Sequence, residues 1–122
     1  MPRVYLAGPP YGEEYRVRAS ALARAAGWEP VDPMRRDFRG RTEGNEAEIV
    51  AGDLVDIDSC DVVLAAFTSP DEGTAMEAWY AQTRGIPVVV YTGGTPAHPW
   101  TVYVARSLHA TLEDAVASLP SA

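Results

Sequence analysis

The sequence predicts an α/β protein in which helices flank a doubly wound, mostly parallel sheet. Short apolar runs alternate with amphipathic stretches of helical length, and glycine- or proline-rich turns separate them. Such alternation is typical of right-handed β-α-β crossovers. The apolar run at 62–67 is continuous, as in a parallel strand that is buried on both faces. With 122 residues, the chain fits a single domain over 1–122.

In the first half of the chain, glycine and proline mark the ends of the expected elements. Gly8-Pro9-Pro10 breaks the first apolar run, and Gly27 stands where a helix C′ glycine is favoured. The elements expected here, in order, are a strand at 3–7, a helix at 13–26, a strand at 28–31, a polar loop at 34–44 that is a candidate lid, and a helix at 45–59.

The second half repeats the pattern, with Gly85 ending one helix and Thr111 as the N-cap of the last. The elements expected here, in order, are a strand at 61–67, a turn at 68–73, a helix at 74–84, a strand at 86–91, a loop at 92–99, a helix at 100–107 and a last helix after Thr111. This order is that of a flavodoxin-like or Rossmann-like sheet. Ligands bind such sheets beyond the carboxyl ends of the strands. We therefore expect the loops 8–12, 68–73 and 92–99 to meet there.

Charge and composition exclude several classes of function. Seventeen acidic residues against ten basic ones give a net charge of −7, which argues against binding to nucleic acid or to an anionic membrane. All ten basic residues are arginine, so a Schiff-base lysine and a P-loop lysine are absent. Cys60 is the only cysteine, which leaves no disulfide and no cysteine cluster for zinc. No signal peptide is visible, and we expect a cytoplasmic protein.

Glu77 is the strongest candidate for a catalytic group. It is expected in the first turn of a helix that follows a buried strand, where the helix dipole keeps a carboxylate ionised and available as a nucleophile. The alternative is structural, because Thr74-x-x-Glu77 also has the spacing of a capping box.

Two further carboxylates favour the catalytic interpretation. Asp71 lies in the same turn, and Asp53 lies on the preceding helix. Two carboxyl groups on either side of a glycosidic bond are the usual equipment of retaining glycosyl chemistry. Asp56 and Asp58 are instead expected on a solvated helix face.

The loop at 34–44 leaves two readings open. Its four arginines, Arg35, Arg36, Arg39 and Arg41, either clamp a phosphate by bidentate hydrogen bonds or are solvated and pair with Asp37 and Glu43. His98 and His109 are too isolated in the sequence to form a metal pair.

Four segments, in this order and spacing, resemble the nucleoside 2-deoxyribosyltransferases and the related deoxynucleotide N-hydrolases. They are Tyr5-Leu6-Ala7-Gly8-Pro9, Gly52-Asp53-Leu54, Cys60-Asp61-Val62-Val63 and Asp71-x-Gly73-x-x-Met76-Glu77-x-x-Tyr80-Ala81. The resemblance implies that Glu77 attacks C1′ of a deoxyribose and that Asp53 is the acid facing the leaving base. It further implies that Tyr5 orients the nucleophile and that Asp71 grips the sugar.

Other residues are expected to bind the substrate. Tyr11 and Trp100 lie on loops from which they can cover a base, and the remaining candidates from the matching segments are Gly8, Pro9, Gly73 and Met76. Relatives commonly complete the sugar site from a neighbouring subunit. The resemblance therefore implies a homo-oligomer built from dimers, with 100–103 near the partner's pocket.

The expected activity is cleavage of the N-glycosidic bond of a 2′-deoxynucleoside and transfer of the deoxyribosyl group to another nucleobase through a covalent Glu77 intermediate. No metal or organic cofactor is needed for it. Three alternatives stay open. They are hydrolysis of (deoxy)nucleoside 5′-monophosphates, a phosphoribohydrolase activity suggested by Gly73-Thr74-x-x-Glu77, and a small nucleotide-binding module without activity.

Overall fold

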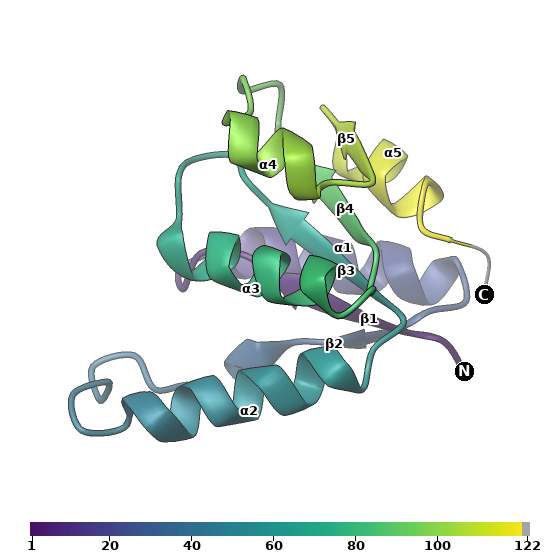
Figure 1. Cartoon of the computed structure of the whole chain (residues 1–122). Coiled ribbons are helices and arrows are strands. Elements are labelled where there is room, and N and C mark those ends of the chain that lie inside the picture. Colours follow the sequence, from purple (N-terminus) through teal and green to yellow (C-terminus); the bar gives the residue numbers. More distant parts are fainter. Residues whose placement is uncertain (121–122) are drawn as a thin grey trace.

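Five parallel strands form the sheet in the computed structural model, which describes residues 1–120. Their spatial order is β2-β1-β3-β4-β5 (Figure 1). The strands are β1 (Arg3–Ala7), β2 (Glu29–Val31), β3 (Val62–Ala66), β4 (Val88–Tyr91) and β5 (Ser107–His109). The chain winds outward in both directions from β1 and β3, so the topological switch point lies between these two strands. The predicted doubly wound α/β fold is confirmed.

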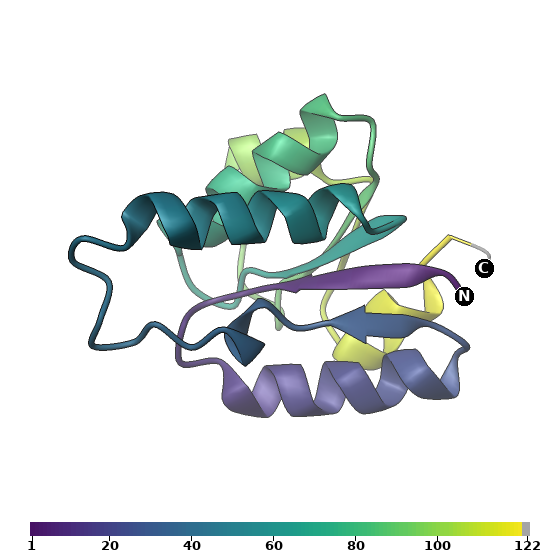
Figure 2. The same cartoon turned by 90° about the horizontal axis from the view of Figure 1, so that it is seen from below.

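Helices cover both faces of the sheet (Figure 2). One face carries α1 (Glu13–Ala25) and α5 (Leu112–Ala117), and the other carries α2 (Glu46–Asp58), α3 (Glu72–Thr83) and α4 (Pro99–Val104). A 3-10 turn, η1 (Pro33–Arg35), precedes the long loop before α2. That loop projects past the sheet in Figure 2. No helix within residues 1–120 is long and apolar enough to cross a membrane.

Alternation along β1 decides which core each of its side chains enters. Val4 and Leu6 pack in the core under α1 and α5, whereas Tyr5 and Ala7 pack in the core under α2, α3 and α4. Successive side chains of a strand point to opposite faces, which produces this division. Tyr5 is fully buried, and its ring therefore points toward the helices that carry the candidate carboxylates.

Two predicted boundaries are wrong. The helix expected at 100–107 ends at Val104, and the chain then forms β5, an edge strand parallel to β4. The helix expected from Thr74 begins at Glu72, because Asp71 caps it. Glu77 is thus the sixth residue of α3 and lies in its second turn rather than its first.

Candidate active site

A hydrogen bond between β1 and α3 forms the centre of the candidate site. The Tyr5 hydroxyl donates to Oε2 of Glu77. Burial raises the pKa of Glu77, the hydrogen bond from Tyr5 opposes the rise, and the nearby carboxylates of Asp53 and Asp71 add to it, which leaves the pKa at about 7. Ionisation of Glu77 by the helix dipole, as the sequence suggested, is therefore not what governs this group.

Tyr5 remains a hydrogen-bond donor at any ordinary pH. Burial raises the pKa of its hydroxyl far above the usual value, and the negative charges of Glu77 and Asp53 add to the effect. Its proton is thus available to hold and orient one oxygen of the Glu77 carboxyl group.

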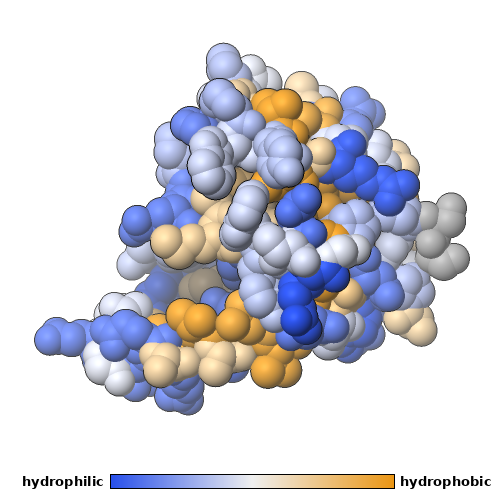
Figure 3. All heavy atoms as spheres, in the orientation of Figure 1, coloured by the Kyte–Doolittle hydropathy of each residue, from blue (hydrophilic) through white to orange (hydrophobic). Residues whose placement is uncertain are grey.

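Asp53 reaches the same place from α2. Its side chain is about three-quarters buried, with 27% exposed, and burial raises its pKa while Arg36 opposes the rise. Asp53 also raises the pKa of both Tyr5 and Glu77, so the three groups interact electrostatically. The surface is hollowed between α2 and α3, the two helices that supply the carboxylates (Figure 3).

The loop after β1 is held from below by α1. Arg16, which is 4% exposed, donates hydrogen bonds to the carbonyl oxygens of Gly8 (2.8 Å) and Pro9 (2.7 Å). A Cβ atom at Gly8 would lie 2.9 Å from the Tyr15 ring, so this position requires glycine. Sequence reasoning missed Arg16, although an arginine on the buried side of an amphipathic helix is a usable signal.

Asp71 caps the N-terminus of α3, a structural role that the sequence analysis did not give it. Its Oδ2 accepts hydrogen bonds from the Thr74 backbone N–H (3.0 Å) and the Thr74 hydroxyl (2.6 Å). The N-cap of α3 is therefore Asp71, so the structural alternative for this segment, a Thr74–Glu77 capping box, is not formed. The second oxygen of Asp71 remains available at the edge of the site.

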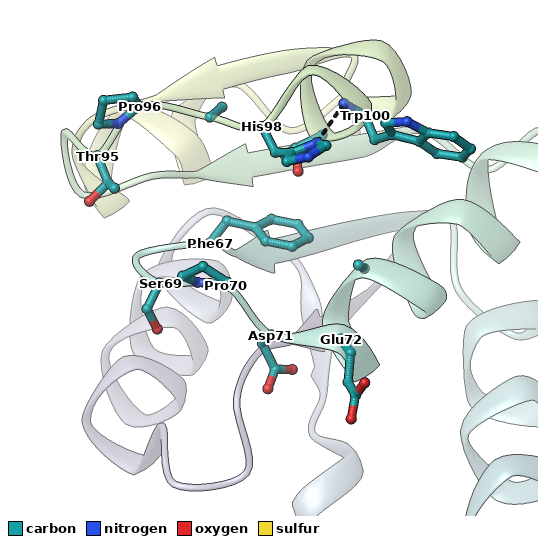
Figure 4. Close-up of a pocket in the computed structure, with 12 residues that line it drawn as sticks. Phe67, Ser69, Pro70, Asp71, Glu72, Thr95, Pro96, His98 and Trp100 are labelled. Carbon is teal, nitrogen blue, oxygen red and sulfur yellow. Dashed lines mark hydrogen bonds between the residues drawn. The ribbon is translucent and has the colours of Figure 1, made fainter.

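A cavity lies beside this cluster rather than on it. It has a volume of about 750 Å³ and lies between the β3–α3 and β4–α4 loops, which are joined by a hydrogen bond from the Thr95 hydroxyl to the Thr68 carbonyl. Asp71 belongs to its wall, as do Phe67 and Trp100, whereas Tyr5, Asp53 and Glu77 do not (Figure 4). The wall of this cavity is mainly apolar, whereas the titratable groups Tyr5, Asp53 and Glu77 interact with one another outside it.

Within residues 1–120, none of the remaining sequence candidates forms a hydrogen bond with the side chains of Tyr5, Asp53 or Glu77. Gly73 lies in the first turn of α3, and Met76 is exposed on the same helix. Tyr11 is 75% exposed, and the Arg39 guanidinium lies over its ring at 5.1 Å. Trp100 is exposed and packs against Trp79.

Asp56 is not on a solvated face, which corrects the expectation from the sequence. It is 5% exposed and binds two guanidinium groups, those of Arg35 (2.8 and 3.0 Å) and Arg36 (2.7 Å). Burial raises the pKa of Asp56, but the two arginines outweigh it and hold the pKa below its usual value. Asp58 is exposed, as expected, and accepts from the Tyr80 hydroxyl.

The arginine loop is paired with carboxylates throughout most of its length. Arg39 binds Asp37, as the sequence predicted, and also Glu13 of α1. Arg41 donates to the Asp37 carbonyl oxygen (2.6 Å) rather than to a carboxylate. Among residues 1–120, no group of three or more histidine, cysteine or acidic side chains is arranged to hold a metal ion.

Comparisons with known proteins identify the family and the fold. The family model described as nucleoside 2-deoxyribosyltransferase matches residues 4–114. A solved 2-deoxyribosyltransferase from the psychrotolerant bacterium Bacillus psychrosaccharolyticus superposes with a TM-score of 0.78 at 21% identity, covering 98% of this chain and 96% of that one. A conserved protein from Enterococcus faecalis V583 superposes with a TM-score of 0.78 at 18% identity, covering 96% of each chain.

No curated protein sequence matches the chain significantly. At these identities, the solved structures establish the likeness of the folds alone. The family model is the stronger finding, because it covers nearly the whole chain and includes all the residues of the candidate site. The chain therefore belongs to the nucleoside 2-deoxyribosyltransferase family.

Proposed function

We propose that this protein cleaves the N-glycosidic bond of 2′-deoxynucleosides and transfers the deoxyribosyl group to a second nucleobase through a covalent bond to Glu77. The observation that carries the proposal is the partly buried Glu77 carboxyl group, which accepts a hydrogen bond from Tyr5 with Asp53 close by. This arrangement supplies a nucleophile in Glu77, a hydrogen-bond donor that orients it in Tyr5 and a second carboxyl group in Asp53. Retaining glycosyl transfer needs at least a nucleophile and a second carboxyl group.

In the first half-reaction, a Glu77 carboxylate oxygen attacks C1′ of the deoxyribose. The bond between C1′ and the base nitrogen breaks, and its electron pair stays on the base. The Asp53 carboxyl group gives its proton to a base nitrogen, so the base leaves neutral and Asp53 becomes a carboxylate. Tyr5 keeps its proton and holds the other oxygen of Glu77 in place.

In the second half-reaction, a ring nitrogen of the incoming base attacks C1′ of the deoxyribosyl ester. The ester bond to Glu77 breaks and restores its carboxylate, and Asp53 takes the proton that the incoming nitrogen loses. The productive form of the free enzyme thus holds one proton on the pair, on Asp53 rather than on Glu77. Two carboxyl groups that interact by charge share a proton in this way over a range of pH.

Unphosphorylated deoxynucleosides fit this site better than their 5′-monophosphates. Arg35, Arg36 and Arg39, the counter-charges that a phosphate would require, already pair with carboxylates. Asp71 lies near enough to Glu77 to raise its pKa, and a phosphate within about 4 Å of a carboxylate is repelled by roughly 4 kcal/mol at an effective dielectric of 20. A free sugar hydroxyl can instead donate to Asp71.

We also propose that the active form is a homo-oligomer. Trp79, Trp100 and Tyr103 form an aromatic cluster on α3 and α4, with ring centroids 5.6 and 6.4 Å from that of Trp79. Trp100 and Tyr103 are 68% and 71% exposed. Exposed aromatic clusters of this kind are enriched where proteins associate. The cluster borders the cavity beside Asp71, so a second copy packed here would narrow the mouth of the site.

The test is base exchange. The protein is incubated with a deoxynucleoside and a different free base, and products are separated by liquid chromatography. We expect the exchanged deoxynucleoside, and in the absence of acceptor a peptide that contains Glu77 and has gained one deoxyribosyl group by mass. Glu77→Gln and Glu77→Ala should lack both products. Release of free deoxyribose alone would identify a hydrolase, and exchange by Glu77→Gln would exclude the covalent route.

A further inference from the structure

A cluster of two arginines and a buried aspartate lies directly behind Asp53. The Asp56 carboxylate accepts hydrogen bonds from both terminal nitrogens of Arg35, and Nη2 of Arg36 lies 2.7 Å from its Oδ2. Charge-assisted bidentate bonds of this kind fix geometry as well as charge. A carboxylate that is 5% exposed with two guanidinium groups around it is a rigid anchor for Arg36.

Gly52 provides the space that Arg36 occupies. A Cβ atom built on Gly52 would lie 2.8 Å from Nε and 2.9 Å from Nη2 of Arg36. The guanidinium group therefore lies against the backbone of α2 at a point where any side chain would displace it. Gly52 has no positive φ, and a helix interior disfavours glycine by about 1 kcal/mol relative to alanine. Close approach of Arg36 is thus the physical reason for a glycine here.

In this position, Arg36 is the cation nearest to Asp53. Its Nη2 lies 3.4 Å from Oδ1 of Asp53. The other charged and titratable groups that act on Asp53 or are acted on by it are Asp56 and Arg35 behind it, Glu77 from α3 and Tyr5 from β1. One side of Asp53 thus faces the paired arginines, and the other faces the proposed nucleophile.

We propose that Arg36 is a positioning residue that holds Asp53 toward the leaving base, and that Gly52 and Asp56 serve to hold Arg36 in place. This inference rests on the proposed function of Asp53 as the acid. A carboxyl group gives its proton to the departing base only when it lies within hydrogen-bonding reach of the base nitrogen, and the contact with Arg36 fixes the position of Asp53. The benefit of Arg36 therefore appears only when the departing base needs a proton.

That dependence on the leaving group distinguishes the proposed role of Arg36 from a purely structural role, which would affect both substrates equally. The guanine of 2′-deoxyguanosine leaves as a neutral base only if it gains a proton. In 7-methyl-2′-deoxyguanosine the base is already a cation and leaves neutral without one. For an enzyme confined to pyrimidines, the corresponding pair is 2′-deoxyuridine and 2′-deoxy-5-fluorouridine, because the fluorinated base is the better leaving group.

The experiment measures kcat/KM for both members of a pair in the full-length protein and its variants. For Arg36→Gln we expect a loss of roughly 10- to 100-fold with the base that needs a proton and of no more than about threefold with the other, in line with the size of general-acid effects. Gly52→Ala should shift the ratio of the two kcat/KM values in the same direction as Arg36→Gln. Arg36→Lys should recover part of the loss seen in Arg36→Gln. Arg41→Gln is the matched control from the same loop.

The substrate that needs no proton also reports that each variant is folded and can form the Glu77 ester. An equal loss on both substrates, or no loss on either, would overturn the role of Arg36. If the protein does not act on deoxynucleosides at all, the result is different, because the unaltered protein then cleaves neither member of either pair. A stronger dependence of kcat/KM on the leaving group in Arg36→Gln but not in Arg41→Gln supports the proposal.

Discussion

At the scale of single residues, the pKa of Glu77 links catalysis to stability. The folded protein holds a proton on this carboxyl group up to about pH 7, whereas the unfolded chain releases it near pH 4.5. Because the folded state binds more protons in that interval, stability falls as pH rises from 4.5 to 7. Ionisation of Glu77 therefore lowers the free energy of unfolding of the folded protein. Such a loss of stability is usual for a reactive group in an active site.

Glu77→Gln should consequently gain stability relative to the unaltered protein as pH rises. Glutamine carries no charge, so the difference in the free energy of unfolding should grow by about 3 kcal/mol between pH 4.5 and pH 8. Denaturant melts at several pH values measure it. Met76→Gln, on the exposed side of the same helix, is the control and should differ from the unaltered protein by a constant amount. If the difference in the free energy of unfolding between Glu77→Gln and the unaltered protein does not change with pH, the raised pKa of Glu77 is contradicted.

The charge of Asp71 should decide between a nucleoside and a nucleotide. We expect kcat/KM to be higher for a deoxynucleoside than for its 5′-monophosphate. Asp71→Asn keeps an N-cap residue but removes the charge, so it should narrow that preference by at least tenfold, given the repulsion estimated from Coulomb's law. Steady-state kinetics at two salt concentrations measure the effect. An unaltered protein that prefers the monophosphate would mean that the arginine loop opens to receive a phosphate.

At the scale of elements, the same residue also fixes where α3 begins. Asp71→Ala removes the acceptor for the Thr74 backbone N–H and should lower the free energy of unfolding by about 1 kcal/mol, the usual effect of losing an N-cap. Asp71→Asn should lower the free energy of unfolding by only about a few tenths of a kcal/mol, because asparagine is also a favoured N-cap residue. Thermal or denaturant unfolding of the pair measures the difference. Equal losses in the two variants would show that the contact with Thr74 does not contribute as a cap.

Sequence reasoning succeeded for elements with a strong apolar pattern and failed where a distant partner decides the outcome. The strands β1, β3 and β4 each contain a continuous apolar run, and these runs predicted the positions of the strands to within two residues. β5 was missed because Ser107-Leu108-His109 has one apolar residue and becomes a strand only by pairing with β4. The start of α3 was placed two residues late because two capping residues compete, and Asp71 rather than Thr74 takes that position.

The candidate site shows the same division. Glu77, Asp53 and Tyr5 were found through a pattern of residues at fixed spacing, and the structure brings them together through one hydrogen bond and mutual charge effects. The burial of Asp56 could not be foreseen, because its partners Arg35 and Arg36 lie about twenty residues away in a loop whose path depends on η1 and α2. Helical periodicity places Asp56 on a helix but does not show what covers it.

At the scale of the whole molecule, the two faces of the sheet differ in what they leave exposed. The face with α1 and α5 packs around a core that includes Trp28 and Leu112. The face with α2, α3 and α4 carries the site, the cavity beside it and the aromatic cluster of Trp79, Trp100 and Tyr103. The surface that a second copy would cover and the residues proposed to perform the chemistry thus share one side of the protein.

The proposed assembly is tested by placing charge in the aromatic cluster. The net charge of −7 per chain opposes association, so apolar contact must drive it. Trp100→Asp with Tyr103→Asp should therefore convert the oligomer to monomers in light scattering at micromolar concentration. Val17→Asp, at a 70% exposed position of α1 on the other face, is the matched control and should leave the mass unchanged. If the second copy also narrows the mouth of the site, base exchange by the monomeric variant should be at least about tenfold slower, since misplaced substrate loses rate steeply. An unaltered protein that is monomeric and fully active would contradict the proposed assembly while leaving the roles of Glu77 and Asp53 untouched.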